Sequence, residues 1–96
     1  MKKFENKTTE ITNGEAKMTY AELALLCIKN INVQKDVTLE EMRKGIKVMD
    51  ILESKPEVIE LEDTDHSFLL QKINAMQWAM YHKDIEAFAD AVKEAK

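Results

Sequence analysis

Glycine and proline are scarce in this chain, and their scarcity restricts the fold class more than any other feature of the sequence. Only Gly14, Gly45 and Pro56 are of these two types among 96 residues. A β-sandwich or barrel needs many tight turns, and glycine and proline are the residues that many such turns require. The sequence therefore favours helices, while 45% hydrophobic and 33% charged residues are the usual balance of a globular protein.

Two capping patterns mark the starts of helices. Thr19 is followed by Glu22, and Thr38 is followed by Glu41. This is the spacing of a capping box, in which the threonine hydroxyl accepts from the glutamate amide and the carboxylate reaches back. Apolar residues at helical spacing follow Thr19. They are Tyr20, Leu23, Ala24, Cys27, Ile28 and Ile31.

The helix that follows Thr38 carries a narrow apolar seam with the a/d pattern of a coiled coil. At spacings of three, four and three residues, it consists of Leu39, Met42, Ile46 and Met49. Gly45 costs about 1 kcal/mol relative to alanine in a helix interior, so its presence here predicts close approach of a neighbouring backbone. Pro56 ends this helix at Ser54 or Lys55.

The second half of the chain predicts two more helices and a short extended segment. One helix is expected over about 65–81, and another begins near Asp84. Ile59 and Leu61 alternate with Glu60 and Glu62, as in a strand with one buried face. We therefore predict a mostly α protein, a small bundle of about four helices, with room for one short β-element near residues 58–62.

Residues 1–18 differ from the rest of the chain. Phe4 and Ile11 are the large apolar residues before Met18, too few to offset the entropy of ordering the segment. The sequence predicts a flexible segment over 1–18 and a single helical domain over 19–96. Two alternatives stay open: the segment covers an apolar seam with Phe4, Thr8 and Ile11, or it forms a strand that pairs with residues 58–62.

Charge and cysteine content restrict the compartment and the partners. The net charge is −4, which disfavours binding to nucleic acid. The single cysteine, Cys27, sits among apolar residues and indicates a reducing compartment. Lys2 and Lys3 are not followed by an apolar stretch, and no apolar run approaches the ~20 residues that span a bilayer. We expect a cytoplasmic protein with no membrane contact.

A nucleic-acid-binding regulator is the alternative function. It would use a basic patch on the second helix, formed by Arg43, Lys44 and Lys47. The simpler interpretation is a solvated helix face, on which Glu40, Glu41 and Asp50 balance these charges.

The sequence predicts no enzyme, no cofactor and no metal. The densest group of ionisable residues is Glu57, Glu60, Glu62, Asp63, Asp65 and His66. It lacks the spacing of an EF-hand loop, so we interpret it as an acidic helix cap rather than a cation site. His66 and His82 would lie about 24 Å apart on one continuous helix, too far to share a metal. A glycine-rich phosphate loop is absent from the sequence.

The apolar helix faces predict an interface. Helices with such wide apolar faces expose more apolar surface than one small bundle can bury, and aromatic residues are enriched at interface centres. We therefore expect contact with a protein partner or a homo-oligomer. The candidate interface residues are Met42, Ile46, Met49, Met76, Trp78, Met80 and Tyr81.

Most of the chain, from residue 20 to residue 95, resembles a family of small bacteriophage and prophage proteins. In that family a Leu-Glu-Asp-x-Asp segment, here Leu61–Asp65, precedes a helix that ends near a tryptophan, here Trp78. The resemblance covers residues 20–95, includes the helix of residues 42–52, and implies no activity. It implies a small assembly, regulatory or host-interaction protein of the host cytoplasm, which acts through protein–protein contact.

Overall fold

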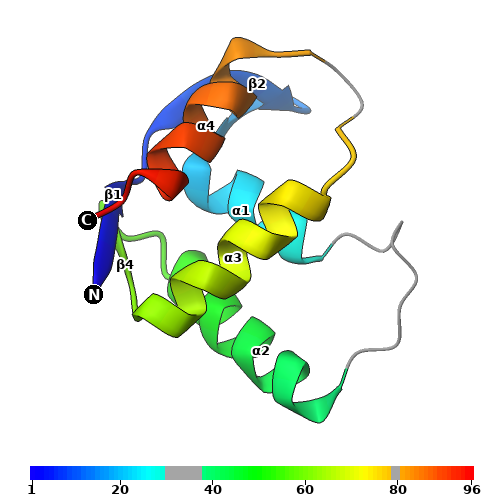
Figure 1. Cartoon of the computed structure of the whole chain (residues 1–96). Coiled ribbons are helices and arrows are strands. Elements are labelled where there is room, and N and C mark those ends of the chain that lie inside the picture. Colours follow the sequence, from blue (N-terminus) through cyan, green and yellow to red (C-terminus); the bar gives the residue numbers. More distant parts are fainter. Residues whose placement is uncertain (30–37, 79–80) are drawn as a thin grey trace.

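Three short strands come first, followed by two helices, a fourth strand and two more helices, in the described part of the chain, residues 1–29, 38–78 and 81–96 of a computed structural model (Figure 1). In these residues four helices are accompanied by two small antiparallel sheets of two strands each. The prediction of a mostly α bundle with at most one short β-element is therefore wrong, and the fold is α+β. The elements are β1 (Lys2–Glu5), β2 (Thr8–Asn13), β3 (Ala16–Thr19), α1 (Tyr20–Ile28), α2 (Leu39–Glu53), β4 (Val58–Leu61), α3 (Asp63–Ala75) and α4 (Lys83–Lys93).

The first sheet joins the two halves of the chain. Strand β1 pairs with β4 so that Phe4 lies opposite Ile59, and both side chains are buried. On the other face Lys3 Nζ lies 3.7 Å from a carboxylate oxygen of Glu60. The backbone amide of Lys3 also donates to the carbonyl of Lys96, at 3.1 Å, so that both termini lie beside this sheet (Figure 1).

The second sheet is a hairpin of β2 and β3. Its turn contains Gly14, whose φ of 71° lies in the left-handed region that glycine adopts without strain. The register shifts between Thr8 and Thr12. There the buried Thr9 hydroxyl donates to the Met18 carbonyl at 2.7 Å and accepts from the Ile11 amide at 3.1 Å. The threonine thus satisfies backbone groups where the regular ladder is interrupted.

These strands supply the β part that the helical prediction lacks. The alternative of a strand paired with residues 58–62 is confirmed, because β1 pairs with β4. The segment has only two large apolar residues, Phe4 and Ile11, but both are buried in the main core. There they pack with residues from distant parts of the chain. The predicted domain boundary at residue 18 falls inside β3.

The helix starts follow the capping patterns closely. Thr19 caps α1 in a complete capping box with Glu22, in which each of the two hydrogen bonds is 3.3 Å long. The Thr38 hydroxyl accepts from the Glu41 amide at 3.1 Å and caps α2. The prediction of a helix to residue 81 is wrong, because α3 ends at Ala75. Met76 has an extended backbone, and the chain beyond α3 packs Met76 and Trp78 against the core.

One hydrophobic core draws on all eight elements. Its largest fully buried side chains are Phe88, Leu23, Leu52, Ile59, Leu61, Leu69, Val48, Val92 and Cys27. The Tyr20 and Phe88 rings pack at 5.4 Å between centroids and join α1 to α4. In the part of the chain described here, no helix combines the length and the apolar character that a membrane crossing needs.

Candidate interaction site on helix α2

Helix α2 has two apolar faces, of which the described residues cover one. Its inner face buries Gly45, Val48 and Leu52 against the rest of the protein. The predicted seam lies on the outer side, where Leu39 is 61%, Met42 48% and Ile46 47% exposed, while Met49 is half-buried. We call these four residues of the seam the α2 stripe. Helix α2 itself lies along the lower edge of the molecule in Figure 1.

The structure adds Leu39 to the predicted interface residues. Leu39 begins the a/d seam and is the most exposed member of the stripe. Its position, three residues before Met42, was the sequence signal that could have identified it as part of the interface.

The other predicted interface residues lie elsewhere. Met76 and Trp78 are half-buried and pack against the core beyond α3, and Tyr81 is fully exposed ahead of α4. Met80 lies outside the described residues, as does Ile31 of the predicted first helix. Figure 1 shows the C-terminal end of α3 and the start of α4 well apart from α2, so the described members of the predicted set divide between two places.

An open depression lies at the second of these places. It is lined by Trp78, Tyr81, His82, Lys83, Ile85 and Glu86. Residues 79–80 between its lining residues lie outside the described part of the chain, and we assign it no ligand.

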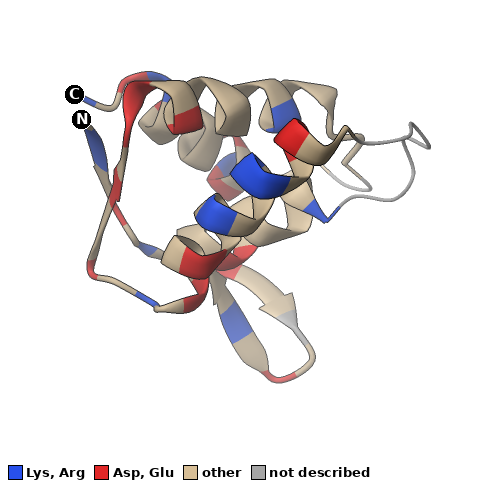
Figure 2. Ribbon diagram, turned by 90° about the horizontal axis from the view of Figure 1, so that it is seen from below, with Lys and Arg blue, Asp and Glu red and all other residues tan. Residues whose placement is uncertain are grey.

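Most of the predicted basic patch is neutralised within the fold. Lys44 Nζ lies 3.9 Å from Glu40, and Lys47 Nζ lies 3.3 Å from Glu62 and 3.0 Å from Asp65. Arg43 has no ion pair among the described residues. Figure 2, which views the molecule from the α2 side, shows basic positions interspersed with acidic ones on this side of the molecule.

The Lys47–Asp65 ion pair fixes α2 to the start of α3. The Asp65 side chain is 3% exposed, and its buried Oδ2 atom lies 3.0 Å from Lys47 Nζ, with no other hydrogen-bond partner among the described residues. The nearby Lys47 ammonium supplies the opposite charge that a buried carboxylate needs. Pairing with Asp65, and then with Glu62, raises the pKa of Lys47 above its ordinary value.

Two further members of the acidic group, Glu60 and Asp63, have cationic partners. Glu60 pairs with Lys3, and Asp63 lies 3.6 Å from the amino terminus. The buried His66 ring contacts the Val92 carbonyl of α4 at 2.5 Å through Nε2. In residues 1–29, 38–78 and 81–96, no three His, Cys, Asp or Glu residues lie together as metal ligands would.

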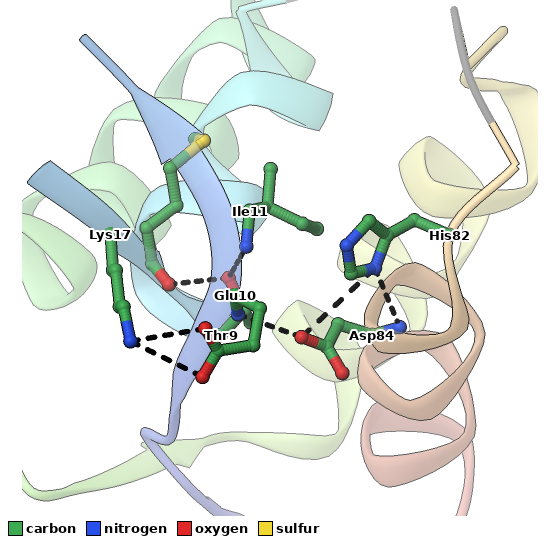
Figure 3. Close-up of polar contacts among 7 residues, drawn as sticks. Thr9, Glu10, Ile11, Lys17, His82 and Asp84 are labelled. Carbon is green, nitrogen blue, oxygen red and sulfur yellow. Dashed lines mark hydrogen bonds and ion pairs between the residues drawn. The ribbon is translucent and has the colours of Figure 1, made fainter. Parts of the chain in front are cut away.

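A second polar cluster connects the hairpin to α4 (Figure 3). The Glu10 amide donates to Asp84 Oδ2 at 2.7 Å, and Lys17 Nζ lies 3.0 Å from Glu10 Oε2. His82 caps α4, because its Nδ1 atom accepts from the Asp84 amide at 3.1 Å. Burial, and then the Asp84 charge, raise the pKa of Tyr20. The cluster therefore holds β2 against the first turn of α4.

Cys27 is buried in the hydrophobic core. Burial raises the pKa of its thiol to about 12, so the nucleophilic thiolate is not formed near neutral pH. Its role is that of a small apolar side chain in α1.

Comparisons of this chain with protein-family models, with curated proteins and with solved structures found no match. A proposal about the function of this chain therefore depends on its own sequence and geometry. The α2 stripe, a row of large apolar side chains open to solvent, is the strongest candidate site.

Proposed function

We propose that this protein is a non-enzymatic protein–protein interaction module and that the α2 stripe is its contact surface. The observation that carries the proposal is the exposure of Leu39, Met42 and Ile46 along one line of a helix. A contiguous row of large apolar side chains on a small protein is typical of a surface that a partner covers. The resemblance to small phage proteins adds an assembly, regulatory or host-interaction role in the host cytoplasm.

The size of the stripe predicts the strength of binding. Complete burial of a Leu, Met or Ile side chain contributes about 1.5–3 kcal/mol, and about half of each of these side chains is exposed. Covering Leu39, Met42 and Ile46 therefore contributes on the order of 3 kcal/mol. A millimolar complex needs about 4 kcal/mol, so neighbouring polar groups must add to the contact. We expect a reversible complex of moderate affinity.

The alternative of a nucleic-acid regulator has less support. Lys44 and Lys47 are held in ion pairs, so only Arg43 of the proposed patch is available to a phosphate without breaking a described contact. The net charge of −4 repels a polyanion as well.

Site-specific photo-crosslinking in cells that produce the chain tests the proposal. A photoreactive phenylalanine derivative replaces Ile46 in one version and Glu15, an exposed residue of the hairpin turn, in the control. We expect an adduct of one defined mass from position 46, absent from position 15. The same adduct should disappear when Met42→Glu is added in the same chain. Equal labelling from both positions, or none from position 46, would refute an interaction through α2.

A further inference from the structure

We infer that the partner of the α2 stripe is a second copy of this chain. In this complex the two α2 helices pack antiparallel across a two-fold axis beside Ile46, and Arg43 of each copy meets Asp50 of the other. This inference rests on the proposed function and specifies the partner of the same site. Two exposed charged residues beside the stripe, Arg43 and Asp50, support it.

Arg43 and Asp50 are opposite charges without ion pairs in the described part of the chain. Both are exposed, and neither has a cation or carboxylate within ion-pair distance there. They are seven residues apart, which is two helical turns and about 10 Å along the helix. The two side chains are therefore too far apart to pair within one helix, but both lie along the same edge of the α2 stripe.

An antiparallel pair of helices brings these two edges together. Seven residues is one heptad, so Arg43 and Asp50 occupy the same heptad position, the one that follows Met42 and Met49. In an antiparallel two-helix pair, identical edges of the two helices face each other. The midpoint between positions 43 and 50 falls between Ile46 and Lys47. A two-fold axis there sets Arg43 opposite Asp50 twice, once on each side of the axis.

The same axis also matches the apolar residues. Ile46 of one copy lies against Ile46 of the other at the centre, and Met42 lies near Met49 on either side. An isologous contact requires such a self-complementary surface. The apolar stripe supplies the attraction, and the charges at its edge determine the orientation.

A parallel pair would not use these charges. In that arrangement the edge with Arg43 and Asp50 would face the opposite edge of the partner helix, where Gly45 and Leu52 are buried in their own core. Both charges would then remain unpaired beside an apolar contact.

Charge reversal with analytical ultracentrifugation at low salt tests the arrangement. Arg43→Glu makes both facing positions acidic, and Asp50→Arg makes both basic, so we expect each variant alone to dimerise at least tenfold more weakly than the unaltered chain. An equimolar mixture of the two variants restores both ion pairs and should recover a mixed dimer. Lys83→Glu and Asp90→Arg, which make the same charge changes at exposed positions of α4, should leave dimerisation unchanged.

Disulfide trapping gives an independent measure of the helix direction. Ile46→Cys lies at the axis and should crosslink two copies, whereas two Leu39→Cys residues would lie roughly 22 Å apart and should not. The native Cys27 is buried and takes no part. Trapping through both positions would indicate a parallel pair and overturn the arrangement.

The outcomes separate this inference from the proposed function. A dimer that needs the stripe but tolerates both charge reversals refutes the antiparallel pairing alone. A monomer that still gives a specific adduct with another protein from position 46 refutes the second copy and retains the interaction module. A monomer that gives no adduct refutes both.

Discussion

Cys27 shows how burial changes the chemistry of one residue. The thiol ionises at its ordinary pKa of 9.0 in the unfolded chain, and at about 12 in the folded protein. Between these two pH values the thiol has lost its proton in the unfolded state but keeps it in the folded state. The free energy of unfolding is therefore unaffected by this group below pH 9 and falls as the pH rises above 9.

The pH dependence of unfolding checks this shift. As the pH rises above 9, we expect the free energy of unfolding to fall about 1.4 kcal/mol per pH unit more steeply for the unaltered chain than for Cys27→Ala. Urea unfolding of both proteins between pH 8 and pH 10.5 measures the difference. Parallel curves would show that the folded state does not protect the thiol.

Single residues also mark how far the sequence could predict the candidate site. The a/d spacing identified Met42 and Ile46, and both are exposed as an interface requires. Spacing alone could not decide which apolar face of α2 the core would cover. That depends on Phe68 and Ile28, which come from other helices and lie against Gly45 of the inner face.

At the scale of elements, Gly45 provides a test of how α2 packs. The sequence predicted close approach of a backbone, but the nearest atoms to an added Cβ are side-chain atoms, Phe68 Cζ at 3.6 Å and Ile28 Cγ2 at 3.9 Å. These are ordinary contact distances. Gly45→Ala should therefore raise the free energy of unfolding by about 0.5–1 kcal/mol through helix propensity. A loss of stability in thermal or urea unfolding would show that the α2 contact is tighter than this.

Strand β1 lies in the N-terminal segment that the composition predicted to be flexible, and its contribution to stability can be tested. Phe4 is buried opposite Ile59, so Phe4→Ala should lower the free energy of unfolding by about 3 kcal/mol. Val58→Ala, in the same sheet but at a side chain that is 45% exposed, is the control and should cost far less. Equal, small effects of both substitutions in urea unfolding would mean that β1 does not belong to the core.

Local signals predicted the helices better than the strands. A capping box and a helical repeat act within a few residues, and so Thr19 and Thr38 located the starts of α1 and α2. The β1–β4 pair joins segments from opposite halves of the chain, and neither strand shows its partner in its own pattern. The β2–β3 hairpin did carry a local signal, a run of β-branched residues before Asn13-Gly14.

At the scale of the whole molecule, the fold buries a core from every element and still leaves one helix face open. Helices α1 and α3 and strand β4 cover the inner face of α2, and Figure 1 shows α1 and α3 between α2 and α4. The outer face of α2 carries the exposed α2 stripe. The charged residues of the same helix are acidic near its two ends and basic in its middle. We expect this open face to be the contact surface of the protein.

Sedimentation equilibrium over micromolar to near-millimolar concentrations, for the unaltered chain and for Ile46→Glu, tests this account most directly. We predict that the unaltered chain rises from 11.1 kDa toward twice that mass with concentration, while Ile46→Glu, which places a charge in the middle of the stripe, stays at 11.1 kDa. Circular dichroism should confirm that the variant is folded. A folded, unaltered chain of 11.1 kDa at every concentration, or a dimer that Ile46→Glu leaves intact, would contradict the account.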